Sequence, residues 1–284
     1  MIFIRYTDII PFYIRLNANC PVAEKSGKGP GSCGGKVADS VAAKNKCLDL
    51  AALLGKAKVP KAEPTRLSSS YKDQSTISGI INEGKRLGLD VKIVGMKDEH
   101  NMDLNRVMTT AVYYRENFPE LNTSGVIITD ASGMSKNSKT VAKSVRYPDG
   151  TNVIMVSAPK LKDRAELKRI MMKSASPNPD TGISWHPPGC NTIQSVIDHE
   201  MGHELEKAYR LLADGSDVKK ILEENIHNGM QVSFKISDYA ATNYPDEAIP
   251  ELWSKYRNSP DPRPLAEAVG EAIMKRAKGS RGSI

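Results

Sequence analysis

The stretch VIDHEMGHEL, residues 196 to 205, contains two histidines separated by three residues, His199 and His203. On an α-helix, residues four apart lie on the same face, so both imidazoles would point the same way. Imidazole pairs of this kind suit zinc, and Glu200 would lie beside that face, within reach of a water molecule at the metal. The stretch therefore predicts a helix that carries two metal ligands and a base.

The residues around this motif predict a helix with two different faces. Apolar residues recur at helical spacing along one face: Ile193, Ile197, Met201, Leu205, Ala208 and Leu212. The histidines fall on another face, which we expect to border a cleft. Gly202 lies inside the helix, where glycine costs about 1 kcal/mol relative to alanine. Such a glycine predicts close packing against another backbone.

Two histidines do not complete the site, because a catalytic zinc takes three protein ligands and keeps a fourth position open. The chain has five histidines, and the other three are poorer candidates: His100, His186 and His227. After His186 come Pro187 and Pro188, which favour a turn. The downstream segment YPDEAIPE, residues 244 to 251, offers three carboxylates: Asp246, Glu247 and Glu251. We expect the third ligand among them.

The order of the expected elements indicates an α+β fold. Apolar and β-branched runs predict strands at 90–96, 124–130, 152–158 and 181–186. Helical periodicity predicts helices at 75–89, 102–121, 163–175, 191–213, 216–230 and 264–278, and Ser75 is the expected cap of the first. Most strands precede most helices and no repeat is present, which favours a small mixed sheet packed on helices.

Composition divides the chain into three expected parts. Residues 1–70 form a poorly structured lead and linker rich in Gly, Ser and Lys, residues 71–260 form the domain that holds the motif, and residues 261–284 form a C-terminal helix and basic tail. Three of the four cysteines lie in the lead: Cys20, Cys33 and Cys47. The absence of a Cys-x-x-Cys pair argues against a zinc ribbon, and a disulfide framework is not expected in a domain of this size.

The chain carries a formal net charge of +7. Its basic residues gather in four segments: 36–61, 136–146, 160–173 and 275–281. The favoured interpretation is solvated faces, and a weak contact with nucleic acid is the alternative. The apolar start is interrupted by charges, and no run approaches the roughly 18 apolar residues of a membrane span. We expect a cytoplasmic protein with no membrane contact.

Two motifs together resemble the zincin metallopeptidases of the gluzincin type related to anthrax lethal factor, a group with phage-encoded and polymorphic-toxin members. HEMGH, residues 199 to 203, matches the family's His-Glu-x-Gly-His helix. SDYAATNYPDEAIPELW, residues 237 to 253, resembles its later motif, Tyr-(Ala/Gly)-x-x-Asn-x-x-Glu-x-x-Ala-Glu. The resemblance covers these stretches well, extends loosely upstream to about residue 75, and implies a zincin-like fold.

Matching positions carry the family's roles to particular residues. Tyr239, Ala240 and Asn243 fit the start of the later motif, and Glu247 and Glu251 keep the family's spacing of four between its two glutamates. The resemblance implies that Glu247 is the third zinc ligand and that Glu251 supports the site from outside the ligand shell. It also implies that Tyr239 faces the reaction centre.

The sequence departs from the family pattern at two positions. One extra residue precedes Glu247, so Asp246 occupies the family's ligand position and remains the alternative ligand. Pro250 stands where the family has Ala. Proline costs about 3 kcal/mol inside a helix but is well placed in its first turn. We favour Glu247, which keeps its distance to Glu251 and has the longer side chain.

The resemblance implies zinc-dependent hydrolysis of peptide bonds by a phage- or mobile-element-associated enzyme. Glu200 would be the base, Tyr239 would donate to the developing oxyanion, and Glu251 would orient a ligand histidine. An extended peptide substrate would pair with an edge strand, expected at residues 181–186. The alternatives are a zincin-fold structural or DNA-binding protein without peptidase activity, virion-associated if phage-borne, and a toxin effector with the same chemistry.

Overall fold

The computed structural model describes residues 69–131, 133–135, 139–259 and 262–281. The chain divides into two units, Met1–Lys58 and Val59–Ile284, and every described residue belongs to the second unit. The predictions for the lead and for its cysteines fall outside the described residues. Within the described ranges, no helix is both long enough and apolar enough to cross a membrane.

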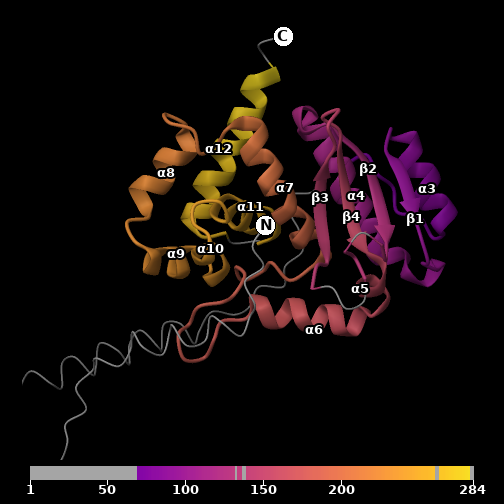
Figure 1. The fold of residues 1–284 in the computed structure, drawn as a ribbon, viewed down its shortest axis with the longest axis horizontal. Helices are drawn as coiled ribbons and strands as arrows, with labels where there is room; N and C mark the ends of the chain where they lie inside the picture. The colour runs from indigo at the N-terminus through magenta and orange to yellow at the C-terminus, as the bar shows by residue number, and fades with distance from the viewer. Residues whose placement is uncertain (1–68, 132, 136–138, 260–261, 282–284) are drawn as a thin grey trace, which may run out of the picture. The chain divides into compact units, whose positions relative to one another are not determined.

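A four-stranded mixed sheet forms one side of the described unit (Figure 1). Its strands are β1 (Asp90–Ile93), β2 (Thr123–Thr129), β3 (Ala142–Arg146) and β4 (Asn152–Ser157), in the order β1-β2-β4-β3. The pairs β1–β2 and β2–β4 are parallel, and β3 runs antiparallel to β4. The predicted α+β class and the small mixed sheet are confirmed, whereas β3 was not predicted.

Helices make up most of the remaining described chain. They are α3 (Ile77–Arg86), α4 (Asn101–Asn117), α5 (Ala158–Lys162), α6 (Arg164–Ala175), α7 (Ile193–Tyr209), α8 (Asp217–Asn225), α9 (Gly229–Lys235), α10 (Asp238–Thr242), α11 (Ala248–Asn258) and α12 (Pro264–Arg281), with short 3-10 turns at Asp98–His100 and Pro119–Leu121. Helix α3 packs on β1, α4 on β2 and α7 on β3, while α11 packs on α7 and α12 packs on α11. Helix α7 thus lies between the sheet and the later helices (Figure 1).

Three local predictions were wrong. The single helix expected at 216–230 is interrupted after Asn225, and α9 begins at Gly229. The cap of α3 is Thr76, whose hydroxyl accepts from Gly79 N, and not Ser75. Residues 181–186 form turns and not a strand, because several of their backbone groups bond to helices α6 and α10 and not to a neighbouring strand. The N–H of His186 donates to Ser174 O, and the carbonyls of Ser184 and Trp185 accept from the first turn of α10.

Helix α7 begins and ends with clear local signals. The Thr192 hydroxyl accepts from Ser195 N while the Ser195 hydroxyl accepts from Thr192 N, which is a capping box. Arg210 adopts the left-handed conformation, φ +51°, at the other end. The predicted apolar stripe lies in the core: Ile193, Ile197, Met201 and Leu205 are buried, with Ala208 and Leu212 packed against them.

A buried polar network fixes α7 against α4 and α11. Asp198, fully buried, accepts from Tyr114 Oη at 2.7 Å and from Asn258 Nδ2 at 2.8 Å. Arg257 Nε lies 3.5 Å from the same carboxylate. Since Asp198 directly precedes the first histidine of the motif, the network sets the rotation of the histidine face.

Gly202 brings α7 and α11 into close contact. A Cβ atom at this position would lie only 2.6 Å from the backbone Cα of Pro250, which occupies the first turn of α11. The prediction that Gly202 permits close approach of another backbone is confirmed. The histidine face is consequently covered by α11 and is less open than expected: the side chain of His199 is 11% exposed and that of His203 is 30% exposed.

We expect Gly202→Ala to lower both stability and metal affinity, although alanine is the better helix former by about 1 kcal/mol. The added methyl group must push α11 away, and overpacking of this kind costs about 1–3 kcal/mol. Gly279→Ala in α12 is the matched control, because its Cβ would meet nothing within 4 Å. Urea unfolding of both variants checks the prediction, and an unchanged or raised midpoint for Gly202→Ala would contradict it.

Candidate metal centre

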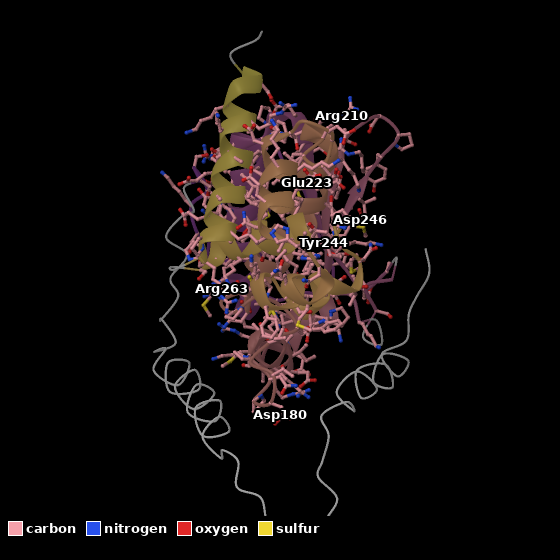
Figure 2. The ribbon with its side chains drawn as sticks, turned by 90° about the vertical axis from the view of Figure 1, so that its left-hand side faces the viewer. Asp180, Arg210, Glu223, Tyr244, Asp246 and Arg263 are labelled. Carbon is pink, nitrogen blue, oxygen red and sulfur yellow. The ribbon has the colours of Figure 1, made fainter. Side chains whose placement is uncertain are left out.

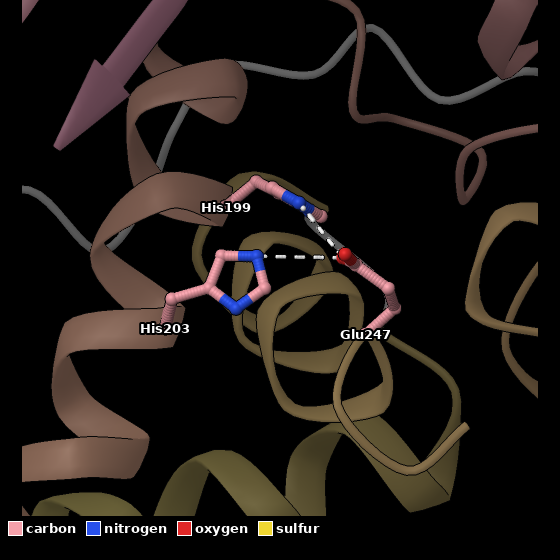
Figure 3. Close-up of side chains that lie close together, drawn as sticks. All are labelled: His199, His203 and Glu247. Carbon is pink, nitrogen blue, oxygen red and sulfur yellow. Dashed lines mark ion pairs between the residues drawn. The ribbon is translucent and has the colours of Figure 1, made fainter. Parts of the chain in front are cut away.

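Three side chains converge between α7 and the start of α11 (Figure 3). His199 Nε2 lies 3.2 Å from Glu247 Oε2, and His203 Nε2 lies 3.4 Å from the same oxygen. One ligand atom from each residue lies within 4.8 Å of the others. The group can therefore hold a metal ion, with two ligands one turn apart on α7 and the third from the residue that precedes α11, which packs on α7.

The chemistry of these atoms fits a cation. Glu247 Oε2 is buried and has no hydrogen-bond donor with good geometry among the described residues. Its neighbours are the two Nε2 atoms, which present lone pairs when each imidazole is neutral with its proton on Nδ1. When neither Nε2 carries a proton, these three electron-rich atoms repel one another, and either a metal ion or a proton on an imidazole relieves the repulsion. Two imidazoles and one carboxylate form a ligand set that suits zinc.

Glu247 lies at the N-terminal boundary of α11, directly before Ala248. Pro250 falls in the first turn, where its missing N–H leaves no hydrogen bond unmade, so the extra residue and the proline are both accommodated. Asp246 is exposed at the surface (Figure 2), and its Oδ2 lies 3.5 Å from Asn243 Nδ2. The structure thus brings Glu247, and not Asp246, to the two histidines.

Glu251 stands behind the three ligand candidates. Its Oε1 lies 2.8 Å from His199 Nδ1, and its Oε2 accepts from the Ser237 hydroxyl at 2.7 Å. Burial raises the pKa of Glu251, but the adjacent histidines outweigh burial and lower it to about 2. The contact lacks hydrogen-bond geometry, but a buried negative charge this close to Nδ1 favours a proton on that nitrogen, which would leave Nε2 free for a metal.

His186 belongs to the site although the sequence argued against it. Its Nδ1 lies 3.0 Å from Glu251 Oε1, the same oxygen that faces His199. Its ring centroid lies 5.0 Å from that of Tyr239 and 6.1 Å from that of His199. The backbone bonds of residues 184–186 hold it there, and the following prolines end the segment. No spacing in the sequence joins His186 to Glu251, 65 residues later.

Glu200 lies on α7 next to His199 and is directed toward β3. The backbone N–H of Ser144 faces its carboxylate and favours the charged form. Burial raises the pKa of Glu200 and is the largest influence on it, opposed by His199 and His203. A carboxylate with a raised pKa beside three potential metal ligands is suited to accept and return a proton near neutral pH.

Tyr239, at the start of α10, forms one wall of the site. Its ring centroid lies 5.6 Å from that of His199 and 5.5 Å from that of Trp185. Burial, followed by the carboxylates of Glu247 and Glu200, raises the pKa of Tyr239, so the phenol keeps its proton. A protonated phenol half-buried beside the metal group can donate a hydrogen bond.

Without a cation, His199 itself holds a proton tightly. Burial lowers its pKa, but the carboxylates of Glu247 and Glu251 outweigh burial and raise it to about 10. The same contacts lower the pKa of Glu247 to about 2. A proton on His199 therefore occupies the place of the metal and competes with it.

We expect metal binding to release a proton and to tighten as the pH rises. Because the metal-free pKa of His199 is about 10, the apparent affinity should increase about tenfold per pH unit between pH 6 and 8. Competition titrations with a zinc chelator at pH 6, 7 and 8 measure this slope, and calorimetry in two buffers counts the protons. An affinity independent of pH would contradict the assignment of His199 as a ligand.

Comparisons of the chain with protein-family models, with curated proteins and with solved structures gave no match.

Proposed function

We propose that the protein is a zinc-dependent peptidase with a zincin-like fold. One observation carries the proposal: His199, His203 and Glu247 present their ligand atoms within 4.8 Å of one another, and Glu200 lies on the same helix beside them. The resemblance of residues 199–203 and 237–253 to the lethal-factor-related zincins supports it. Three ligands and an adjacent carboxylate meet the requirement for a catalytic, as opposed to a purely structural, zinc site.

The residues of the chain supply proton transfer and charge stabilisation. A zinc ion bound here would lower the pKa of a water molecule and polarise a carbonyl group. Glu200 takes the proton of the attacking water and delivers it to the nitrogen of the leaving amine. Tyr239 donates to the oxygen on which negative charge develops, and Glu251 holds the ring of His199 in place.

Strand β3 is the edge along which we place an extended peptide, in place of the expected segment 181–186. Val141 O bonds to Ser157 N and Tyr147 N to Thr151 O, so the odd-numbered residues pair with β4. The backbone groups of Ala142, Ser144 and Arg146 consequently face away from β4, on the side of Glu200. A peptide added to this edge would bond to the main-chain groups of Ala142 and Arg146 and to the carbonyl of Ser144, since the Ser144 N–H already serves Glu200, and would pass in front of the base.

Peptide cleavage by the zinc-loaded protein tests the proposal. We expect a library of internally quenched fluorescent decapeptides to contain substrates, with cleavage stopped by a chelator and restored by zinc. Stoichiometric zinc without hydrolysis of any library member would contradict peptidase activity. Salt-sensitive DNA binding in that case would favour the zincin-fold binding protein instead.

A further inference from the structure

Helix α7 touches the edge strand β3 at two points, through two glutamates one helical turn apart. The first is at Glu200: the main chain of Ser144 points away from β4, and its N–H lowers the pKa of the Glu200 carboxylate by hydrogen bonding. The second is Glu204, whose Oε2 lies 2.8 Å from Nε of Arg146. Each contact joins a carboxylate of the helix to a donor of the strand.

The spacings of the two elements match. Four residues of α-helix span about 6 Å, and two residues of strand span about 6.6 Å. Glu200 and Glu204 are four apart on the helix, and Ser144 and Arg146 are two apart on the strand. The even-numbered residues of β3 turn their main-chain groups away from β4, and α7 packs on β3, so the N–H of Ser144 and the side chain of Arg146 can both reach that helix. A slip of β3 by one residue would break both contacts at once.

The contact between Glu204 and Arg146 lies at the boundary between α7 and β3. The side chain of Glu204 is only 4% exposed, although it is charged. Its other partner, Lys207, comes from the same helix, lies 3.2 Å away and is 62% exposed. Lys207 therefore cannot fix the strand, whereas Arg146 joins two elements that are 58 residues apart in the sequence.

We propose that Arg146 and Glu204 are positioning residues that hold the outer edge of β3 in register with Glu200. This inference rests on the proposed function, because the edge is where the extended peptide would lie. With the pair intact, the N–H of Ser144 aims the base, and the neighbouring edge groups receive the peptide at a fixed distance from it. With the pair broken, the strand end can move relative to α7 while the three ligand candidates stay on α7 and α11.

Replacing Arg146 by methionine tests the proposal with little change in side-chain length. We expect kcat on a cleaved decapeptide to fall about 10- to 100-fold, as for a misplacement of about 1 Å at a reacting centre. KM should change less, and zinc content should stay at one ion per chain. Arg146→Lys, which keeps the charge, should recover most of the loss, and Lys207→Met, which removes the other partner of Glu204, should match the unchanged protein.

Hydrogen exchange at the amide of Ser144 gives a readout that needs no activity. We expect exchange to be at least about tenfold faster in Arg146→Met than in the unchanged protein or in Lys207→Met. Equal exchange and equal kcat in Arg146→Met would overturn the proposal, and so would an equal loss in Lys207→Met. If the unchanged protein cleaves no peptide, the proposed function fails, while the exchange rates still decide whether the pair holds the strand.

Discussion

Replacing Glu200 with glutamine is expected to abolish peptide hydrolysis while the protein keeps its metal and its fold. Glutamine has nearly the same shape but cannot accept the proton of the attacking water. General base catalysis contributes about 10²- to 10⁴-fold to such reactions, equivalent to about 3–5 kcal/mol of the activation barrier. Initial rates on a decapeptide substrate measure the loss, and zinc content and thermal unfolding show whether the site persists.

Glu206→Gln is the matched control for this experiment. Glu206 lies on the same helix and is half-buried, but it follows the histidine pair and is not among the residues that form the metal group. We expect its rate to equal that of the unchanged protein. Full activity in Glu200→Gln would rule out Glu200 as the base, even if zinc were bound as expected.

Removing the side chain of Glu247 is expected to reduce zinc affinity more than any other single change in the later motif. Glu247→Ala deletes the carboxylate that completes the group formed with the two histidines. Loss of a residue behind the ligands typically costs about 10- to 100-fold in metal affinity, and loss of a ligand should cost more. Competition with a chelator at pH 7 measures the change.

Asp246→Ala provides the comparison that separates the two carboxylates. Asp246 is the adjacent residue and occupies the ligand position in the family pattern, yet its side chain is exposed. We expect its zinc affinity to equal that of the unchanged protein. A larger loss in Asp246→Ala than in Glu247→Ala would contradict the geometry of the site.

Local sequence signals predicted the part of the site that lies within one helix. The spacing of His199 and His203 required a helix, and the structure has one. The glycine between them predicted a close backbone contact, which Pro250 provides. These features follow from helical geometry, which repeats every few residues and can therefore be recognised without tertiary information.

Strands and long-range partners were predicted less well. The sequence AKSVR of β3 has no β-branched or apolar alternation, because an edge strand beside a polar site can carry charged residues. Residues 181–186 include β-branched and aromatic side chains, which favoured a strand, but Trp185 packs against Tyr239 beside the candidate site. His186 joins Glu251 only through the folding of α6, α10 and α11 around it, which no local pattern records.

The coordination of zinc in the purified protein tests the central claim most directly. X-ray absorption at the zinc edge, combined with the zinc content per chain, reports the number and kind of bound atoms. We predict one zinc ion per chain with two imidazole nitrogens and one carboxylate oxygen at about 2.0–2.2 Å, and loss of the oxygen ligand in Glu247→Ala. Protein that takes up no zinc, or zinc whose spectrum lacks imidazole scattering, would contradict the account.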